Sequence, residues 1–301
     1  YSQAIEFQTN NYAVMFKRGL LSLRLENFES AQLDVDELLK VVPQHPGANY
    51  IQGLLHFNAA RYPEAITALS VAEPVYSQFP LVLFFLGSAQ LIEGKFDQAV
   101  VQAARFHNLQ PQSILGRKLL ATIRLQQGKN DDVQELLATV LASNPEDIGA
   151  LNLMASALLR DDKAEEGITL LTKVAELQPD SPVAQVRLGA GLLVTGKGGD
   201  AERHIEAALD LNPEFQEADI LLVLNHLQNQ DYEAAIAAAK AYRLRNPTSV
   251  TPLNLLGRVY QQAGQNAKAK ESFEDVLKRD ASDPGANHNL AQIAISEGDF
   301  K

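Results

Sequence analysis

Apolar residues recur at helical spacing along the whole chain, in segments that come in pairs. Between residues 250 and 283, Leu253, Leu256 and Val259 form one stripe, and Phe273 and Val276 form a second. Steps of three and four residues place these side chains on one face of a helix. A turn that contains glycine separates the two stripes. The pattern predicts two amphipathic helices joined into a hairpin.

The hairpin pattern repeats with a fixed period of 34 residues. Prolines at that interval close successive units at Pro111, Pro145, Pro179, Pro213 and Pro247. When these prolines are numbered position 32 of the unit, a small residue stands at position 8 in eight of nine units. A fixed period of this length indicates stacked repeats, in which each unit contacts only its neighbours.

We expect residues 1–301 to form a single array of such units. Residues 1–11 fit the tail of a preceding repeat, and residues 284–301 fit a partial ninth repeat. The eight full repeats span 12–45, 46–79, 80–113, 114–147, 148–181, 182–215, 216–249 and 250–283. Within each repeat, the first helix should cover positions 1–14 and the second helix positions 18–31.

Glycine and proline predict where the helices end. Glycine at position 15 can take the left-handed conformation that ends the first helix, as at Gly94 and Gly264. The second unit differs, because Pro74 lies three residues before the expected position and disfavours a helix at Glu73. We therefore expect its second helix to stop near Glu73, and residues 75–79 to form an irregular connector.

These features resemble the tetratricopeptide repeat over essentially the whole chain. The family's Leu-Gly pair stands at Leu86-Gly87, Leu188-Gly189 and Leu256-Gly257. The family's alanine of the second helix and its closing proline are also present, whereas its frequent tryptophan at position 4 is absent. The resemblance implies an all-α fold, a right-handed α–α superhelix (solenoid) of 34-residue helical hairpins. It also implies a concave groove lined by the first helices.

Composition narrows the function classes. The net charge of −11 argues against nucleic-acid binding, which needs clustered Lys and Arg. The chain has no cysteine, so disulfides and thiolate catalysis are excluded. Its longest apolar runs are too short to span a bilayer, and residues 1–11 lack the features of a signal peptide. Both ends fall inside repeats, so we expect a soluble piece of a longer array.

Candidate chemistry is sparse. None of the six histidines has a second ligand at metal-binding spacing, and His56 and His226 occupy position 11, where we expect packing between helices. The glycine-rich stretch 196–199 follows a predicted helix rather than a strand, and it lacks the Ser or Thr of a phosphate-binding loop. We expect no catalytic, cofactor-binding or metal site, and thus no enzyme activity in this chain.

The groove positions of the resembled family, which are 2, 5, 6, 9, 12 and 13, carry an unusual charge balance. They contribute one acid, Glu217. They contribute six cations: Lys17, Arg24, Lys118, Arg160, Arg187 and Arg258. In a chain of negative net charge, this segregation predicts a basic groove that attracts an acidic ligand.

The same positions change character along the chain. The first three units contribute apolar residues that include Phe16, Leu20, Tyr50, Leu54 and Phe84. The last two units contribute the polar residues Asn254, Arg258, Gln262, His288, Asn289 and Gln292. The apolar end is either a binding site or the seat of another helix of the same protein. The polar end could hydrogen-bond an extended peptide, a carboxylate or a sugar.

A carboxylate clamp known from chaperone-binding members of the family matches only in part. The clamp has Lys at position 5, Asn at position 9 and Asn at position 6 of the next unit. Asn254, Arg258 and Asn289 occupy those positions here. The missing lysine argues against recognition of a chaperone tail.

Residues 218–277 also resemble the large tetratricopeptide proteins of bacterial exosortase and PEP-CTERM sorting systems, which accompany exopolysaccharide genes. The likeness lies in LLVLNHL, PLNLLGRVY and AKESFEDVL. It implies a periplasmic or envelope-associated scaffold that holds a protein partner or an acidic polysaccharide. Two alternatives remain: a region that presents substrate to a larger enzyme, such as a glycosyltransferase, and a cytosolic adaptor.

Overall fold

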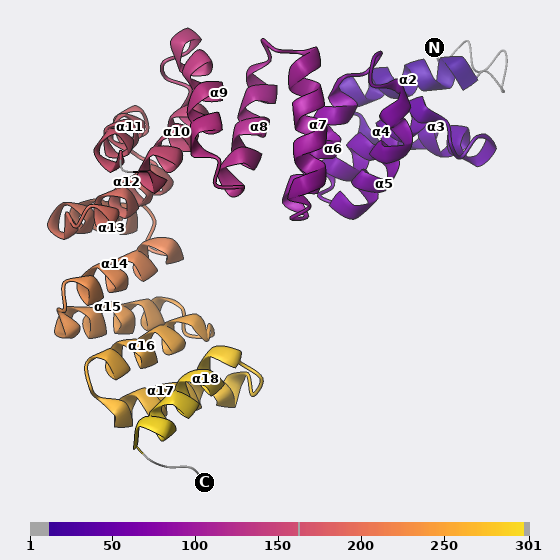
Figure 1. Cartoon of the computed structure of the whole chain (residues 1–301). Helices are drawn as coiled ribbons and strands as arrows, with labels where there is room; N and C mark the ends of the chain where they lie inside the picture. The colour runs from indigo at the N-terminus through magenta and orange to yellow at the C-terminus, as the bar shows by residue number, and fades with distance from the viewer. Residues whose placement is uncertain (1–11, 162, 298–301) are drawn as a thin grey trace. The chain divides into compact units, whose positions relative to one another are not determined.

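The computed structural model describes residues 12–161 and 163–297. Within these ranges the chain forms seventeen α-helices, one short 3₁₀ helix and no strand (Figure 1). The predicted all-α fold of helical hairpins is confirmed. The expected tail of a preceding repeat, residues 1–11, lies outside the described residues, as do Asp162 and residues 298–301.

Each repeat contributes two helices at the predicted places. The first helices are α2 (Tyr12–Arg24), α4 (Pro46–Asn58), α6 (Leu81–Ile92), α8 (Ile114–Gln126), α10 (Ile148–Arg160), α12 (Pro182–Val194), α14 (Gln216–Gln228), α16 (Thr251–Gln262) and α18 (Pro284–Glu297). The second helices are α3 (Phe28–Val41), α5 (Tyr62–Ala72), α7 (Phe96–Leu109), α9 (Asn130–Ser143), α11 (Ala164–Leu177), α13 (Gly198–Leu211), α15 (Tyr232–Arg245) and α17 (Asn266–Arg279). Most bounds differ from the prediction by one residue. None of the described helices is long and apolar enough to cross a membrane.

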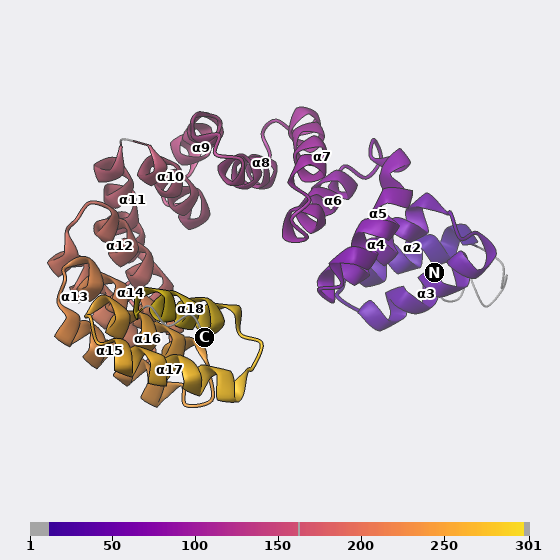
Figure 2. The ribbon, with the colours of Figure 1, turned by 60° about the horizontal axis from the view of Figure 1, so that its bottom comes forward.

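The chain divides into two compact units, Tyr1–Ala157 and Leu158–Lys301. Within the first unit, α3 packs against α4, α5 against α6 and α7 against α8. The second unit repeats this arrangement from α11 to α18, so each second helix contacts the first helix of the next hairpin (Figure 2). The cores are therefore local to neighbouring hairpins, as expected of stacked repeats.

Small residues allow close approach of the two helices of a hairpin. A Cβ atom on Gly257 of α16 would lie 2.5 Å from Cε1 of Phe273 in α17. A Cβ atom on Gly53 of α4 would likewise lie 2.5 Å from Cγ of Leu69 in α5. Real Cβ atoms do not approach carbon so closely, so position 8 is small because the facing side chain occupies the space.

Seven of the turns that follow first helices, all within the described residues, use the left-handed conformation. The glycines at position 15 have positive φ, for example 70° at Gly94 and 71° at Gly264. The same position has φ of 57° at Glu26, 55° at Ala60 and 59° at Gln230. The predicted turn is confirmed, and the conformation is adopted even where glycine is absent.

The second hairpin ends as predicted from Pro74. Helix α5 stops at Ala72, and the 3₁₀ helix η1 (Glu73–Val75) carries the proline. Backbone hydrogen bonds of turn type follow, including Phe79 N–H to Val75 O at 3.0 Å. This connector places Phe79 directly before α6.

Candidate functional site

Four of the predicted polar groove residues meet in one pocket at the end of the second unit. The pocket lies between α16 and α18 and has a volume of about 480 Å³. It is lined by Asn254, Arg258, Asp283, Pro284, Gly285, His288 and Asn289. We call it the α16–α18 pocket. Gln262 and Gln292 are exposed on the same two helices but do not line it.

Helical spacing explains why these side chains converge. Asn254 and Arg258 are four residues apart on α16 and therefore share a face. His288 and Asn289 lie in the second turn of α18, which follows the loop that carries Asp283. The three positions of the carboxylate clamp, at Asn254, Arg258 and Asn289, thus line the same pocket.

Asp283 is a lining residue of the pocket that the pattern of first-helix positions does not predict. Its Oδ1 accepts a hydrogen bond from the Ala286 N–H at 2.7 Å and so caps α18. Its Oδ2 accepts from Nδ2 of Asn254 at 3.1 Å. Asp283 occupies position 34, just outside the first helix, so it is not one of the groove positions of the family. An Asp three residues before the capped N–H is the signal that could have revealed it.

The pocket offers both donors and acceptors. The exposed guanidinium of Arg258 has five N–H donors, and the half-buried amide of Asn289 offers a donor and an acceptor. The Oδ1 atom of Asn254 is buried and accepts no hydrogen bond from the described residues. Asp283 offsets the charge of Arg258, so the pocket is less basic than the cation count predicts.

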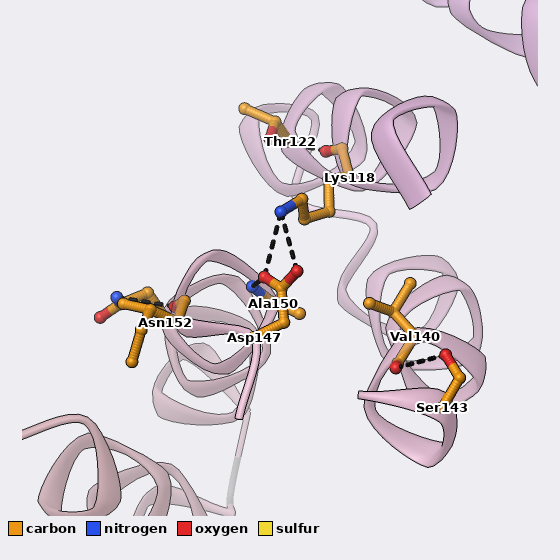
Figure 3. Close-up of polar contacts among 8 residues, drawn as sticks. Lys118, Thr122, Val140, Ser143, Asp147, Ala150 and Asn152 are labelled. Carbon is orange, nitrogen blue, oxygen red and sulfur yellow. Dashed lines mark hydrogen bonds and ion pairs between the residues drawn. The ribbon is translucent and has the colours of Figure 1, made fainter. Parts of the chain in front are cut away.

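The first unit contains the same arrangement with a lysine in place of Asn254. Nζ of Lys118 in α8 donates to both carboxylate oxygens of Asp147 at 3.0 Å (Figure 3). Asp147 also caps α10 by accepting from the Ala150 N–H at 2.8 Å. Burial opposes ionisation of Asp147, but the hydrogen bonds from Ala150 and Lys118 outweigh it, so the pKa of its carboxyl lies below the ordinary value. Lys118 is therefore not available as an unpaired groove cation.

The other four predicted groove cations line none of the pockets described in either unit. Lys17 and Arg24 are exposed on α2 of the first unit, and Arg160 and Arg187 are exposed on α10 and α12 of the second. A continuous basic groove along the whole chain therefore stays a prediction. Arg258 is the predicted cation that lies in a pocket with other predicted residues.

The predicted apolar end of the groove is largely packed by the chain itself. The ring of Phe79 stacks on Tyr50 with centroids 5.1 Å apart, and it meets Phe16 edge-on at 6.1 Å. Tyr50 is buried; burial raises the pKa of its hydroxyl, and the charge of Arg24 partly opposes this. Sequence reasoning placed Phe79 in the connector but did not foresee this contact.

Other members of the apolar set are also core residues. Leu20 and Leu54 pack partly buried against the cluster that contains Tyr50 and Leu69. Phe84 contacts Phe106 with ring centroids 5.6 Å apart. Because these side chains pack between neighbouring hairpins, the exposed apolar surface is smaller than the sequence predicts.

The histidines are mostly packing residues. Burial lowers the pKa of His56, His107 and His204, and nearby arginines lower it further. Within residues 12–161 and 163–297, no group of three or more His, Asp or Glu side chains is placed to hold a metal ion.

Comparison with known proteins places this geometry in a family. The family model described as tetratricopeptide repeat matches residues 16–78, 118–182, 186–249 and 254–301. A search of curated proteins found no match.

Solved structures of repeat proteins share the fold. A tetratricopeptide repeat protein from Parabacteroides merdae is 13% identical with a TM-score of 0.58, over 94% of this chain and 98% of that one. PilW, a widely conserved type IV pilus biogenesis factor, is 19% identical with a TM-score of 0.59, over 71% of this chain and 99% of that one. The C-terminal part of a repeat protein from Cytophaga hutchinsonii is 13% identical with a TM-score of 0.57, over 80% of this chain and 99% of that one.

At these identities the likeness concerns the fold alone. The family model, in contrast, covers most of the sequence in four segments. The chain belongs to the tetratricopeptide repeat family.

Proposed function

We propose that this chain is a noncatalytic scaffold that binds a peptide segment of a protein partner in the α16–α18 pocket. Tetratricopeptide repeats serve as interaction scaffolds, and the convergence of Asn254, Arg258, His288 and Asn289 on one pocket carries the proposal. A partner carboxylate would accept from Arg258 and Asn289. A partner N–H would donate to Asp283, whose acceptor capacity exceeds its two bonds.

The mixed charge of the pocket favours a peptide over a polyanion. A polymer that carries only negative groups gains from Arg258 but meets the carboxylate of Asp283. A peptide presents N–H donors as well as carbonyl and carboxylate acceptors, so it can satisfy both sides. An acidic polysaccharide is therefore the second candidate, supported by the exposed Arg160 and Arg187 on first helices of the same unit.

We also propose that the scaffold works in the bacterial envelope, in exopolysaccharide or protein-sorting assembly. The support is the resemblance of residues 218–277 to repeat proteins of PEP-CTERM systems. Fractionation of source cells with an antibody against the chain tests this location. Recovery of the protein in the periplasmic or membrane fraction is expected, and recovery in the cytosol alone would contradict it.

Photo-crosslinking tests the pocket in living cells of the source organism. A photo-reactive residue is placed at His288, which is exposed and lines the pocket. Its matched control carries the same residue at Glu176, which is exposed on α11 away from the pocket. Mass spectrometry then identifies the adducts.

We expect a protein adduct from position 288 that is absent from position 176 and is lost when Arg258→Glu is added. A carbohydrate adduct at position 288 would replace the peptide proposal with the polymer one. The same adducts from both positions, or none from position 288, would remove the α16–α18 pocket as the binding site.

A further inference from the structure

The second unit has another concave surface, on the opposite helices of the hairpins. It is a groove between the second helices α15 and α17, with α16 as its floor, and its volume is about 730 Å³. In Figure 1 these three helices follow one another in the last third of the chain. We call it the α15–α17 groove. It shares no lining residue with the α16–α18 pocket.

Cations dominate this groove. Lys240 and Arg243 come from α15, and Lys268 and Arg279 come from α17, whereas its acids are Glu271 and Asp275. Asp275 is already neutralised: Lys278 donates to it at 2.9 Å, and Arg243 lies 3.9 Å away. The groove thus concentrates positive charge on a chain whose net charge is −11.

The four cations of the groove differ in how firmly the chain holds them. Arg279 is held at the groove's end, where it donates to the backbone oxygen of Pro247 at 2.6 Å. Lys240 is exposed on α15, and Lys268 is exposed on α17 with its Nζ 5.6 Å from the ring centre of Tyr260. Lys268 also donates to its neighbour Gln265 at 2.8 Å, a contact on the same turn that a ligand can displace at small cost.

Apolar surface lies between the cations. Leu244 is 82% exposed, the most exposed of the large hydrophobic side chains in the described chain. The floor is formed by Leu256 and Tyr260, which are almost fully buried. A ligand that only neutralised charge would leave Leu244 in water, so the groove favours a ligand with an apolar side chain as well.

The first unit provides an internal comparison. The equivalent groove between α7 and α9 is smaller, at about 260 Å³. Its position 19 is Asp132 in place of Lys268, and positions 25 and 29 are Ala104 and Asn108 in place of Lys240 and Leu244. The repeat fold therefore does not by itself produce the basic and apolar combination.

We propose that the α15–α17 groove is a second interaction surface, which binds an acidic segment of a partner protein that carries a large apolar side chain between carboxylates. The carboxylates would pair with Lys240 and Lys268, and the apolar side chain would cover Leu244 over the floor of Tyr260. Combined with the α16–α18 pocket, this surface would let one array hold two partners.

Fluorescence anisotropy at physiological salt tests this proposal on the purified chain. The probe is a fluorescein-labelled Glu-Glu-Leu-Leu-Glu-Glu peptide, and the comparison probe is Glu-Glu-Ser-Ser-Glu-Glu. The groove variant is Lys240→Glu with Lys268→Glu. Its matched control, Lys95→Glu with Lys129→Glu, makes the same charge change at exposed turns of the first unit.

We expect the leucine probe to bind the wild type more tightly than the serine probe. The groove variant should lose about tenfold or more in affinity, since it replaces two ion pairs with repulsion. Leu244→Ser, a change at an exposed site, should lose about threefold in affinity for the leucine probe only. The control variant should bind as the wild type does.

Three results would overturn the proposal. The first is equal binding by the groove variant and the wild type, or no binding by either. The second is an equal loss in the control variant, which would indicate general charge attraction. The third is equal affinity for the two probes, which would indicate a polyanion rather than an apolar acidic segment. Because the two surfaces share no lining residue, failure of one site does not imply failure of the other.

Discussion

Two aspartates just before first helices combine capping with contacts to the preceding hairpin. Asp147 caps α10 and pairs with Lys118, and Asp283 caps α18 and accepts from Asn254. In each case the partner is the residue at position 5 of the preceding first helix. The aspartate thereby links two successive repeats and fixes the orientation of a groove side chain.

Replacement of Asp147 by Asn tests the charged part of this link, because Asn retains the cap but loses the ion pair. The folded-state pKa of Asp147 lies below its ordinary value, so the carboxylate stabilises the fold above that ordinary value. The stabilisation is lost as pH falls through the folded-state pKa. We expect Asp147→Asn to lower the free energy of unfolding by about 1 kcal/mol at neutral pH and by less at pH below about 4.

Urea unfolding followed by circular dichroism measures the difference at both pH values. Asp210→Asn, at an exposed position of α13, is the control and should differ little from the wild type. A destabilisation of Asp147→Asn that is equal at neutral and acidic pH would contradict the role of the ion pair.

The close contact at position 8 gives a second prediction at this scale. In Gly257→Ala the new Cβ atom would meet the ring of Phe273, which cannot move without disturbing the core of the hairpin. We expect a loss of about 1–3 kcal/mol, despite the better helix propensity of alanine. Thermal unfolding should show it, with Gly199→Ala as control, because a Cβ atom at Gly199 meets nothing within 4 Å. Equal stability of the two variants would show that the helices can separate at little cost.

At the scale of the helix, seven of the described hairpin turns contain one residue in the left-handed conformation. In four of these turns the residue is glycine, whereas Glu26, Ala60 and Gln230 adopt the same conformation although they carry a Cβ atom. That conformation costs about 1–2 kcal/mol for a residue other than glycine. The packing of the two helices therefore imposes the turn where local preference opposes it.

Ala60→Gly should consequently stabilise the first unit, or leave it unchanged once the larger entropy of the unfolded chain is counted. Ala59→Gly is the matched control, since Ala59 has φ of −84° and gains nothing from glycine. We expect Ala59→Gly to be the less stable variant by about 1 kcal/mol in urea unfolding. The reverse order would refute the strain at position 15.

The sequence predicts most helix bounds to within about one residue, because apolar spacing, turn glycines and closing prolines all repeat in register. It also explained the early end of α5 from Pro74. It missed the stacking of Phe79 on Tyr50 and the bonds of Asp147 and Asp283, since these join a loop to a helix about thirty residues away. Helical periodicity carries no information on such contacts.

The candidate site was predictable only in part for the same reason. The groove positions of the first helices include Asn254, Arg258, His288 and Asn289, and these four residues line one pocket. The count also included Lys118, which is paired, and Tyr50, which is buried. Pairing partners and burial depend on residues at position 34 and in connectors, which a list of first-helix positions omits.

At the scale of the molecule, the second unit carries two concave surfaces of different chemistry. The α16–α18 pocket is lined by both Arg258 and Asp283, and its proposed ligand is a peptide. The α15–α17 groove combines lysines with an exposed leucine, and its proposed ligand is an acidic apolar segment. A scaffold that joins two partners would need such independent surfaces.

The most direct measurement is isothermal titration calorimetry with the partner identified by crosslinking from position 288. Wild type, Arg258→Glu and the control Arg203→Glu, which changes an exposed charge on α13, are compared at the same salt concentration. We predict that Arg258→Glu weakens binding by about tenfold or more, whereas Arg203→Glu binds as the wild type does. Equal affinity of all three proteins would contradict the claim that the α16–α18 pocket holds the partner.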